Sequence, residues 1–321
     1  MYLIKRLFFL IPTFFAITVM TFFVTQLAPG DPVSAMTDLN PNVSMQAKEA
    51  WAKIRGLDQP VWKRYGHWLS NLLRGDLGYS FKDGEKVADK ILSRIPITLT
   101  ISGISLFLIL VLAIPIGVLS AAKKNSWVDH LFSVFVFLGF SIPSFWLALL
   151  LVSFLGVRYP LFPVSGIHSL DYEYMTTFEK VVDMARHLFL PLLVSTLTGL
   201  AGITRFVRNS MVEVLNEDFI LLARANGLSE IKILFEYALK NALLPLITIL
   251  GLYVPQLLGG AVIFETIFSI PGMGKLMFDA VMARDIPVYM AILTMSAFLT
   301  LIGNFWADVA YKMVDPRIKY E

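Results

Sequence analysis

The 321-residue sequence contains no cysteine, and only 16% of its residues carry a charged side chain. Without cysteine the chain forms no disulfide, no thiolate metal site and no thiol nucleophile. A soluble domain carries a charge on about one residue in four, so the low charge argues against an ordinary water-soluble protein. The net charge of +3 is too small to indicate nucleic-acid binding. With 56% hydrophobic residues, the composition indicates an integral membrane protein.

The sequence also lacks the motifs of common hydrolases. Residues 272–275, Gly-Met-Gly-Lys, lack the earlier glycine and the following serine or threonine of a phosphate-binding loop. Near Ser105, Phe107 stands where a nucleophile elbow needs its second glycine. The four histidines are scattered and show no metal-ligand spacing. We therefore expect a chain that is not an enzyme and that binds no metal or cofactor of its own.

Six apolar runs are long enough to cross a bilayer as helices, which takes about 20 residues each. They are Phe8–Ala28, Ile97–Ala121, Val128–Val157, Leu188–Phe206, Ala242–Phe264 and Val288–Val309. The third run is long for one crossing, so we expect a tilt or a kink near Gly139 and Pro143. The first run is longer than a signal-peptide core and is expected to remain as an anchor. The predicted fold is therefore all-α with six transmembrane helices.

Basic residues set the expected orientation, because short cytoplasmic loops carry an excess of lysine and arginine. With the N-terminus inside, twelve basic residues face the cytoplasm: Lys5, Arg6, Lys123, Lys124, Arg205, Arg208, Arg224, Lys232, Lys240, Lys312, Arg317 and Lys319. The two short outer loops hold five: Arg158, Lys180, Arg186, Lys275 and Arg284. Both termini and the polar insert 208–240 are therefore expected in the cytoplasm.

The chain divides into an N-terminal segment with the first transmembrane helix (1–29), an extracytoplasmic helical cap (30–94) and a five-helix core (95–321). In the cap, Ser44–Arg55 and Val61–Leu73 are typical of amphipathic helices, and Gly56 is placed to end the first. Glu85–Ser93 predicts a third helix. The cap either packs over the transmembrane helices or meets a partner or substrate on the outer side.

The insert 208–240 is polar, lies between two apolar runs and is typical of a helical hairpin. Asp218 is a plausible N-cap for a helix over Phe219–Asn226, and Gly227 can end that helix in a left-handed conformation. Ser229 then caps a second helix that leads to the next apolar run. An inert connector is usually much shorter, and a DNA-binding helix pair is not tied to a membrane at both ends. We therefore interpret the insert as a surface for a soluble partner.

Short motifs follow one another along the chain: LAPGDP (27–32), GDLGYSF (75–81), SIPSFW (141–146), ARANGL (223–228), ALKNALLP (238–245), ETIFSIPGMGKL (265–276) and VDPRI (314–318). In this order they resemble the membrane subunits of ATP-binding-cassette importers, in the dipeptide, oligopeptide and nickel branch. The general importer motif, placed with its glycine on Gly227, keeps only Ala223 and Leu239. The segments 223–228 and 238–245 instead match the variant that is typical of the peptide branch.

The resemblance implies a permease subunit of the bacterial cytoplasmic (inner) membrane that forms half of a pathway for di- or oligopeptides. It implies a second permease (usually a different chain), two cytoplasmic ATP-binding subunits that use ATP-Mg, and an extracytoplasmic substrate-binding protein. The residues that would couple this chain to the ATPases are Asp218, Ala223, Arg224, Ala225, Gly227, Leu228, Ser229 and Glu230. Nickel or another small solute is the alternative cargo. A stand-alone channel or secondary carrier is the alternative from a different class, although the hairpin and the lack of a visible internal repeat argue against it.

Polar and small residues mark one side of the fourth and fifth apolar runs, where they either line a pathway or allow close helix packing. Gln256 is the strongest pathway candidate, because an amide in mid-membrane needs a partner or water. The other candidates for the translocation path are Ser195, Gly199, Gly259, Gly260 and Glu265. Glu265, at the outer end of the fifth run, lies either at a gate or at the level of the lipid headgroups.

Overall fold

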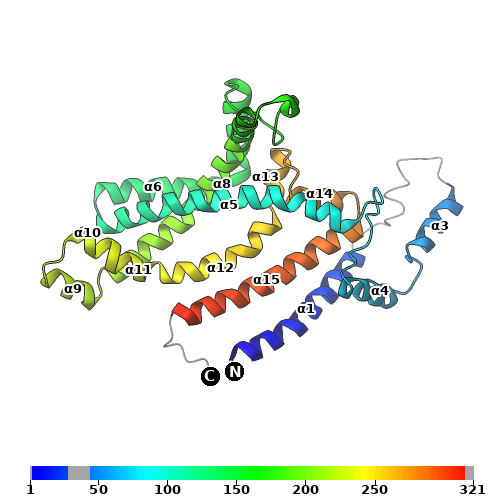
Figure 1. Ribbon diagram of the computed structural model, residues 1–321, viewed down its shortest axis with the longest axis horizontal. Helices are drawn as coiled ribbons and strands as arrows, with labels where there is room; N and C mark the ends of the chain where they lie inside the picture. Colours follow the sequence, from blue (N-terminus) through cyan, green and yellow to red (C-terminus); the bar gives the residue numbers. More distant parts are fainter. Residues whose placement is uncertain (1, 28–43, 315–321) are drawn as a thin grey trace.

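The computed structural model describes residues 2–27 and 44–314 of the chain. Within these ranges the regular structure is helical, apart from an isolated bridge between Tyr79 and Lys86. In Figure 1, α5 (Val87–Ala122) extends along the long axis of the molecule, and α1 (Tyr2–Leu27) and α15 (Ile286–Val314) run obliquely below it. The all-α fold class predicted from the sequence is confirmed.

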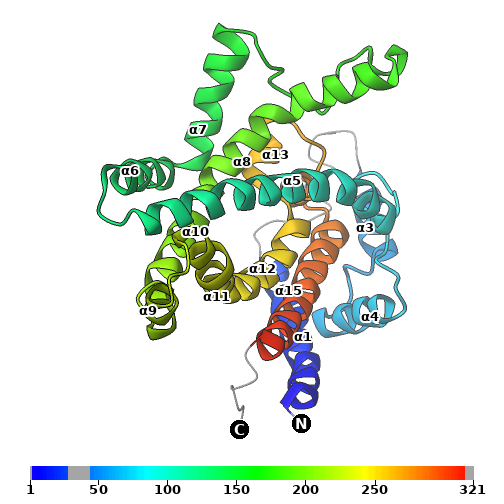
Figure 2. The ribbon, with the colours of Figure 1, turned by 60° about the vertical axis from the view of Figure 1, so that its left-hand side comes forward.

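The remaining α-helices are α3 (Met45–Ile54), α4 (Val61–Leu73), α6 (Trp127–Ser141), α7 (Ser144–Leu151), α8 (Thr177–Val214), α9 (Asp218–Ala225), α10 (Glu230–Lys232), α11 (Leu239–Ala242), α12 (Leu244–Gly259), α13 (Val262–Ile267) and α14 (Met273–Met282). Two π-helical segments, η1 (Val152–Arg158) and η3 (Ile233–Ala238), and a short 3₁₀ turn, η2 (Tyr172–Tyr174), complete the list. In space, α5 packs along α8 and against α12, and α15 contacts both α12 and α1 (Figure 2).

Four helices within the described residues are long and apolar enough to cross a membrane: Phe8–Leu27, Val87–Ala122, Thr177–Val214 and Ile286–Ala307. They contain most or all of the first, second, fourth and sixth predicted runs. A fifth candidate consists of two helical pieces, Glu230–Ala242 and Leu244–Gly251, with a bend of 43° between them. The count of six transmembrane helices therefore stays a prediction.

The third predicted run is broken where the kink was expected. Helix α6 ends at Ser141, and Ile142 is extended with φ −85° and ψ 123°. A residue before proline is pushed out of the helical region by the proline ring, so the chain turns at Ile142–Pro143 and restarts as α7. Figure 2 shows α7 leaving α6 in a clearly different direction.

The fifth predicted run is also broken, at a glycine near its outer end. Helix α12 stops at Gly260, which has φ 72°, and α13 begins two residues later. The prediction of one continuous helix through Phe264 is therefore wrong. The apolar residues continue through the break, from Leu257 and Leu258 to Val262 and Ile263, so hydrophobicity alone did not reveal it.

Helices occur in the cap at both predicted amphipathic segments, with Ser44 as the N-cap of α3 and with φ 63° at Gly56. The predicted third helix, Glu85–Ser93, is not a separate element. Helix α5 begins at Val87 and continues without interruption to Ala122. Val87 and Ile91 are 0% and 3% exposed, so the outer turns of α5 are buried in the same core as α15. The domain boundary drawn between residues 94 and 95 thus falls inside a helix.

A buried carboxylate attaches the cap to the transmembrane helices. Asp285, in the turn between α14 and α15, is 2% exposed. It accepts a hydrogen bond from the Ser80 hydroxyl and another from the Phe81 backbone N–H at 2.8 Å. Ser80 and Phe81 close the sequence motif 75–81. This motif therefore fixes the loop before α5 to the start of α15.

Candidate functional site

The insert 208–240 folds as a helical hairpin at one end of the molecule, visible at the left of Figure 1 around α9 and α10. Helix α9 begins with Asp218, and its N-cap is Glu217, which makes no side-chain capping bond. The prediction of Asp218 as N-cap was wrong by one position, because either acidic residue suits the first turn of a helix. Ser229 is the N-cap of α10, as predicted, although its side chain makes no capping bond.

The turn of the hairpin depends on a left-handed residue. Gly227 has φ 76°, as predicted, and its N–H donates to the Arg224 carbonyl at 2.9 Å. The next N–H, of Leu228, donates to the Ala223 carbonyl at 3.3 Å. These two bonds are those of a glycine-terminated helix end. A residue with a Cβ is strained at this φ, so glycine is needed here although the space around it is open.

The second half of the hairpin is helical but irregular. Helix α10 passes directly into the π-helical η3 and then into α11, which leads to α12. The predicted second helix is therefore present at these residues. Its π-helical middle was not predicted, since π-helical turns have no distinctive sequence pattern and are frequent at functional positions.

Buried side chains fix the hairpin to the helices behind it. Ile220, Ile233 and Ala238 are 0% exposed and Ala223 is 5% exposed. They pack in one cluster with residues of α5 and α8, and the half-buried Leu228 joins the same cluster. Ala223 and Leu228 thus hold the hairpin in place instead of presenting a surface.

The other six predicted coupling residues lie on the open side of the hairpin: Asp218, Arg224, Ala225, Gly227, Ser229 and Glu230. Arg224 and Glu230 form a forked ion pair, with N–O distances of 3.0 and 3.3 Å, across the turn. The sequence analysis missed the large apolar side chains on this side. They are Phe219 (41% exposed), Leu221 (54%), Leu222 (63%), Ile231 (72%) and Phe235 (53%). Their spacing relative to the buried Ile220 and Ala223 is the signal that identifies them.

An ion pair with a buried carboxylate lies where the hairpin begins. Asp129, at the start of α6, is 3% exposed and receives both Nε and Nη2 of Arg208, each at 2.7 Å. The Ser120 hydroxyl and the Asn125 backbone N–H also donate to this carboxylate. Asp129 therefore joins the ends of α5, α6 and α8. We call these four residues the inner staple.

Three of the predicted pathway residues line one cavity between α5, α8 and the α12–α13 break. The cavity has a volume of about 320 Å³, and Ser195, Gly199 and Glu265 lie in its wall. Its serine and threonine side chains are Thr98, Ser102, Ser105, Ser195 and Thr198. The Ser105 hydroxyl is shielded from solvent and has no hydrogen-bond partner within the described part of the chain. This wall can therefore offer polar groups to a solute.

The remaining pathway predictions are placed differently. Gly259 and Gly260 end α12 and do not line the cavity. The Gln256 side chain lies outside the described residues. Gly199 also serves close packing, because a Cβ at this position would lie 2.4 Å from the Ile109 side chain on α5. Gly199 therefore both lines the cavity and allows close helix packing, which were the two alternatives that the sequence left open.

Glu265 is the centre of a compact hydrogen-bonded knot at the outer end of this cavity. Its carboxylate, 5% exposed, accepts the backbone N–H groups of Lys275 at 2.8 Å and Ala261 at 3.2 Å. The Thr98 hydroxyl of α5 donates to it at 3.3 Å and accepts the Met273 N–H at 2.8 Å. Glu265 and Thr98 thus satisfy free N–H groups at the start of α14. We call these residues the outer knot.

The outer knot explains the glycines of the motif 265–276. The N-cap of α14 is Gly272, which has no side chain to cap the helix. A Cβ on Gly272 would lie 2.4 Å from the Glu265 carboxylate, and a Cβ on Gly274 would lie 2.5 Å from the Val262 nitrogen. Glycine is therefore required for the close approach, and Glu265 holds α13, α14 and α5 together.

Two protein families match the chain. The family described as "binding-protein-dependent transport system inner membrane component" matches residues 113–320. The N-terminal family of the same membrane components matches residues 1–102. Together these matches include the hairpin, the buried carboxylates of Asp129, Glu265 and Asp285, and the described part of the cap.

Relatives match over their whole length. The chain is 41% identical to the oligopeptide transport system permease protein AppB of Bacillus subtilis, over 99% of both chains. It is 38% identical to the di/tripeptide transport system permease protein DppB of Pseudomonas aeruginosa, over 100% of this chain and 99% of the relative. It is 35% identical to the dipeptide transport system permease protein DppB of Escherichia coli K12, with the same coverage.

The fold is similar to that of a solved transporter structure, described as inward-facing conformations of the MetNI methionine ABC transporter. The TM-score is 0.55 at 18% sequence identity. The match covers 70% of this chain and 96% of the other. At this identity the likeness concerns the fold alone.

Proposed function

Since this chain belongs to the family of inner membrane components of binding-protein-dependent transport systems, we propose that it imports short peptides as one of two permeases in an ATP-driven complex. The observation that carries this proposal is the full-length identity of 35% to 41% with relatives whose names specify dipeptide, tripeptide and oligopeptide transport. Nickel or another small solute is the alternative cargo.

The hairpin 208–240 is the proposed contact with a cytoplasmic ATPase. Its buried residues attach it firmly to α5 and α8, and its open side carries Leu221, Leu222 and Ile231 beside charged groups. Exposed apolar residues with a polar rim are typical of protein interfaces. Because the hairpin has its own hydrophobic anchor, a displacement imposed by the ATPase moves the transmembrane helices with it.

The cavity between α5, α8 and α13 is the proposed half of the translocation pathway. Hydroxyl groups of Ser102, Ser105 and Ser195 give it a polar wall. The Glu265 carboxylate in the same wall already accepts backbone N–H groups, so hydroxyls are the polar groups left for solutes of differing side chains. In this arrangement a second permease supplies the facing wall. An extracytoplasmic binding protein then delivers the peptide to the side where the cap lies, with both termini in the cytoplasm.

The test is reconstitution of this permease in proteoliposomes with a related second permease, two ATPases and a binding protein. We expect uptake of a radiolabelled dipeptide that stops when the ATPase carries an inactivating substitution in its own nucleotide site. Uptake that persists without ATP would identify a channel or secondary carrier and overturn the proposal. ATP-driven uptake of Ni²⁺ without peptide uptake would overturn the proposal that the cargo is a peptide. Full uptake with this chain as the sole permease would show that two copies of it form a symmetric pair, and the proposal of two different permeases would be wrong.

A further inference from the structure

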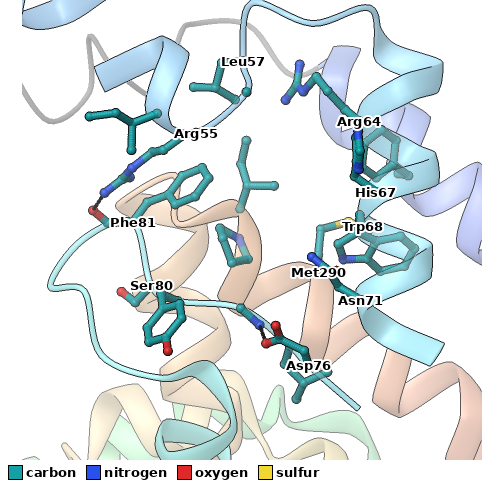
Figure 3. Close-up of a pocket in the computed structure, with 18 of the residues that line it drawn as sticks. Arg55, Leu57, Arg64, His67, Trp68, Asn71, Asp76, Ser80, Phe81 and Met290 are labelled. Atoms are coloured by element: carbon teal, nitrogen blue, oxygen red, sulfur yellow. Dashed lines mark hydrogen bonds between the residues drawn. The ribbon is translucent and has the colours of Figure 1, made fainter. Parts of the chain in front are cut away.

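A second cavity lies between the cap and helices α1 and α15 (Figure 3), and the cap lies at the opposite end of the molecule from the hairpin (Figure 1). Its volume is about 670 Å³, within the range of about 300–1,000 Å³ found for small-molecule sites. One wall comes from α4, another from residues 54–59, and a third from the turn 76–84. The ends of α1 and α15 form the rest. We call it the outer pocket.

The walls of the outer pocket are held by buried interactions, so the pocket is a feature of the folded core. Ser80 and Phe81 are fixed to Asp285, as described above. On the other side, Trp68 of α4 packs against Phe22 of α1, with ring centroids 5.8 Å apart. A pocket between two fixed walls keeps its shape when it is empty, which reduces the cost of binding a ligand.

Arg64 brings an unpaired positive charge to this pocket. It is half-buried, and within the described residues its guanidinium makes no hydrogen bond and no ion pair. Burial lowers the pKa of Arg64 from its ordinary value, which reflects the loss of water around the charge. Arg55, the second arginine of the pocket, instead donates to the Phe81 carbonyl at 3.1 Å and lies over the Trp51 ring. Among the described residues, Arg64 is thus the arginine of the pocket that has no hydrogen-bond or ion-pair partner for its side chain.

Other groups of the pocket complement a small zwitterion. Figure 3 shows Asp76 on the side of the pocket away from Arg64. One Asp76 carboxylate oxygen accepts the Gly78 N–H at 2.8 Å, and the carboxylate remains exposed. The Gln26 side-chain nitrogen is shielded from solvent and has no partner among the described residues. Trp68, Phe81 and Met290 add apolar surface between these polar groups.

We propose that the outer pocket binds a short peptide in its zwitterionic form, with Arg64 holding the C-terminal carboxylate and Asp76 the N-terminal ammonium. Arginine suits this role, because its planar guanidinium donates two parallel hydrogen bonds to a carboxylate. The apolar surface between the two charges accommodates peptide side chains without selecting one of them. The proposal rests on the proposed function and adds a site on the cap side where a peptide pauses before it enters the membrane.

The experiment measures peptide binding to the assembled transporter in nanodiscs, without the binding protein and without nucleotide. The probes are the dipeptide Ala-Phe and its C-terminal amide, which lacks the negative charge, followed by ligand-observed NMR. The test variant is Arg64→Gln. The matched control is Lys63→Gln, which removes the same charge from the neighbouring, exposed position of α4 outside the pocket.

We expect Ala-Phe to bind at least about tenfold more tightly than its amide, since a hydrogen-bonded charge pair is lost with the carboxylate. Arg64→Gln should abolish this preference and Lys63→Gln should keep it. Equal binding of acid and amide, no binding to the unchanged protein, or equal loss in both variants would each overturn the pocket proposal. These outcomes are separable from failure of the proposed function, which is judged by ATP-driven uptake in the complete complex. A complex that imports peptides without this preference refutes the pocket alone.

Discussion

Replacing Glu265 by glutamine tests whether its carboxylate is a structural part of the outer knot or a charge that faces the cargo. Glutamine keeps the size of the side chain, so no cavity is created. The carboxylate accepts two backbone N–H groups and one hydroxyl, whereas glutamine offers one acceptor oxygen and one NH₂ donor. In Glu265→Gln, the NH₂ group therefore faces a backbone donor that has lost its acceptor.

The expected cost follows from these contacts. A buried N–H left without an acceptor costs about 1–3 kcal/mol, and a hydrogen bond to a charged group contributes about 1.5–3 kcal/mol. With one backbone bond kept and one lost, we expect the local stability of the α14 start to fall by about 2–4 kcal/mol. At about 1.4 kcal/mol for each factor of ten, this corresponds to roughly 30- to 700-fold faster opening of that turn.

Hydrogen–deuterium exchange of the purified transporter measures this opening directly. Peptides that contain Met273–Lys275 should exchange faster in Glu265→Gln by the factor given above. The control is Glu179→Gln, which also removes a carboxylate that accepts a backbone N–H, from Thr176 at 2.8 Å. Glu179 lies at the exposed start of α8, where water replaces the lost acceptor, so we expect a change below about 1 kcal/mol there.

The outcome for transport separates the two roles of Glu265. If the carboxylate holds α14, exchange and peptide uptake change together, and Glu265→Asp also fails because the shorter side chain cannot span both N–H groups. Unchanged exchange at 273–275 in Glu265→Gln, with altered peptide selectivity, would refute the structural role. Glu265 would then be a pathway charge.

Three further predictions concern the hairpin and the orientation. Gly227→Ala should destabilise the hairpin by about 1–2 kcal/mol and weaken ATPase binding, because alanine is strained at the positive φ of this position. Gly66→Ala, inside α4 with open space around it, should be neutral or stabilising. Equal effects of the two substitutions on thermal unfolding would show that the positive φ of Gly227 is not what requires glycine there. Leu222→Asp should leave the fold intact and reduce ATPase co-purification at least about tenfold, and undiminished co-purification would place the contact elsewhere. Single cysteines at Ser70 and Ser229 should react with an impermeant reagent from opposite sides of the membrane, and only the cysteine at Ser70 should react in intact cells. Labelling of both in intact cells would contradict the predicted orientation.

Features set by neighbouring residues were predictable from the sequence. The limits of α4, the end of α3 before Gly56, the turn at Gly227 and the break at Pro143 all depend on contacts within one or two helical turns. Proline and glycine restrict or free the backbone at their own positions, so their effects do not depend on distant parts of the chain. These predictions therefore needed no knowledge of the tertiary structure.

Features set by contacts between distant segments were not predictable in the same way. Glu265 could be placed at the outer end of its run, but its partner Thr98 lies 167 residues earlier in the sequence. Arg208 and Asp129 are 79 residues apart, and nothing in the local sequence links them. The outer start of α5 was assigned to a separate helix, because the burial of Val87 and Ile91 depends on α14 and α15.

Helix α5 connects the buried carboxylates of Asp129 and Glu265. It contributes Ser120 to the inner staple and Thr98 to the outer knot, and the proposed pathway cavity lies beside it between these two points. At about 1.5 Å per residue, the two hydroxyls are about 33 Å apart along the helix, close to the thickness of the hydrocarbon core. A displacement of the hairpin therefore reaches the outer knot through a single element. Pro96 and Pro115 lie inside α5 and lack an N–H group, so bending of this element should concentrate at these two positions. The residues of α5 that line the cavity, from Thr98 to Ile109, all lie between the two prolines, so a bend at either proline tilts this wall of the cavity as one rigid piece.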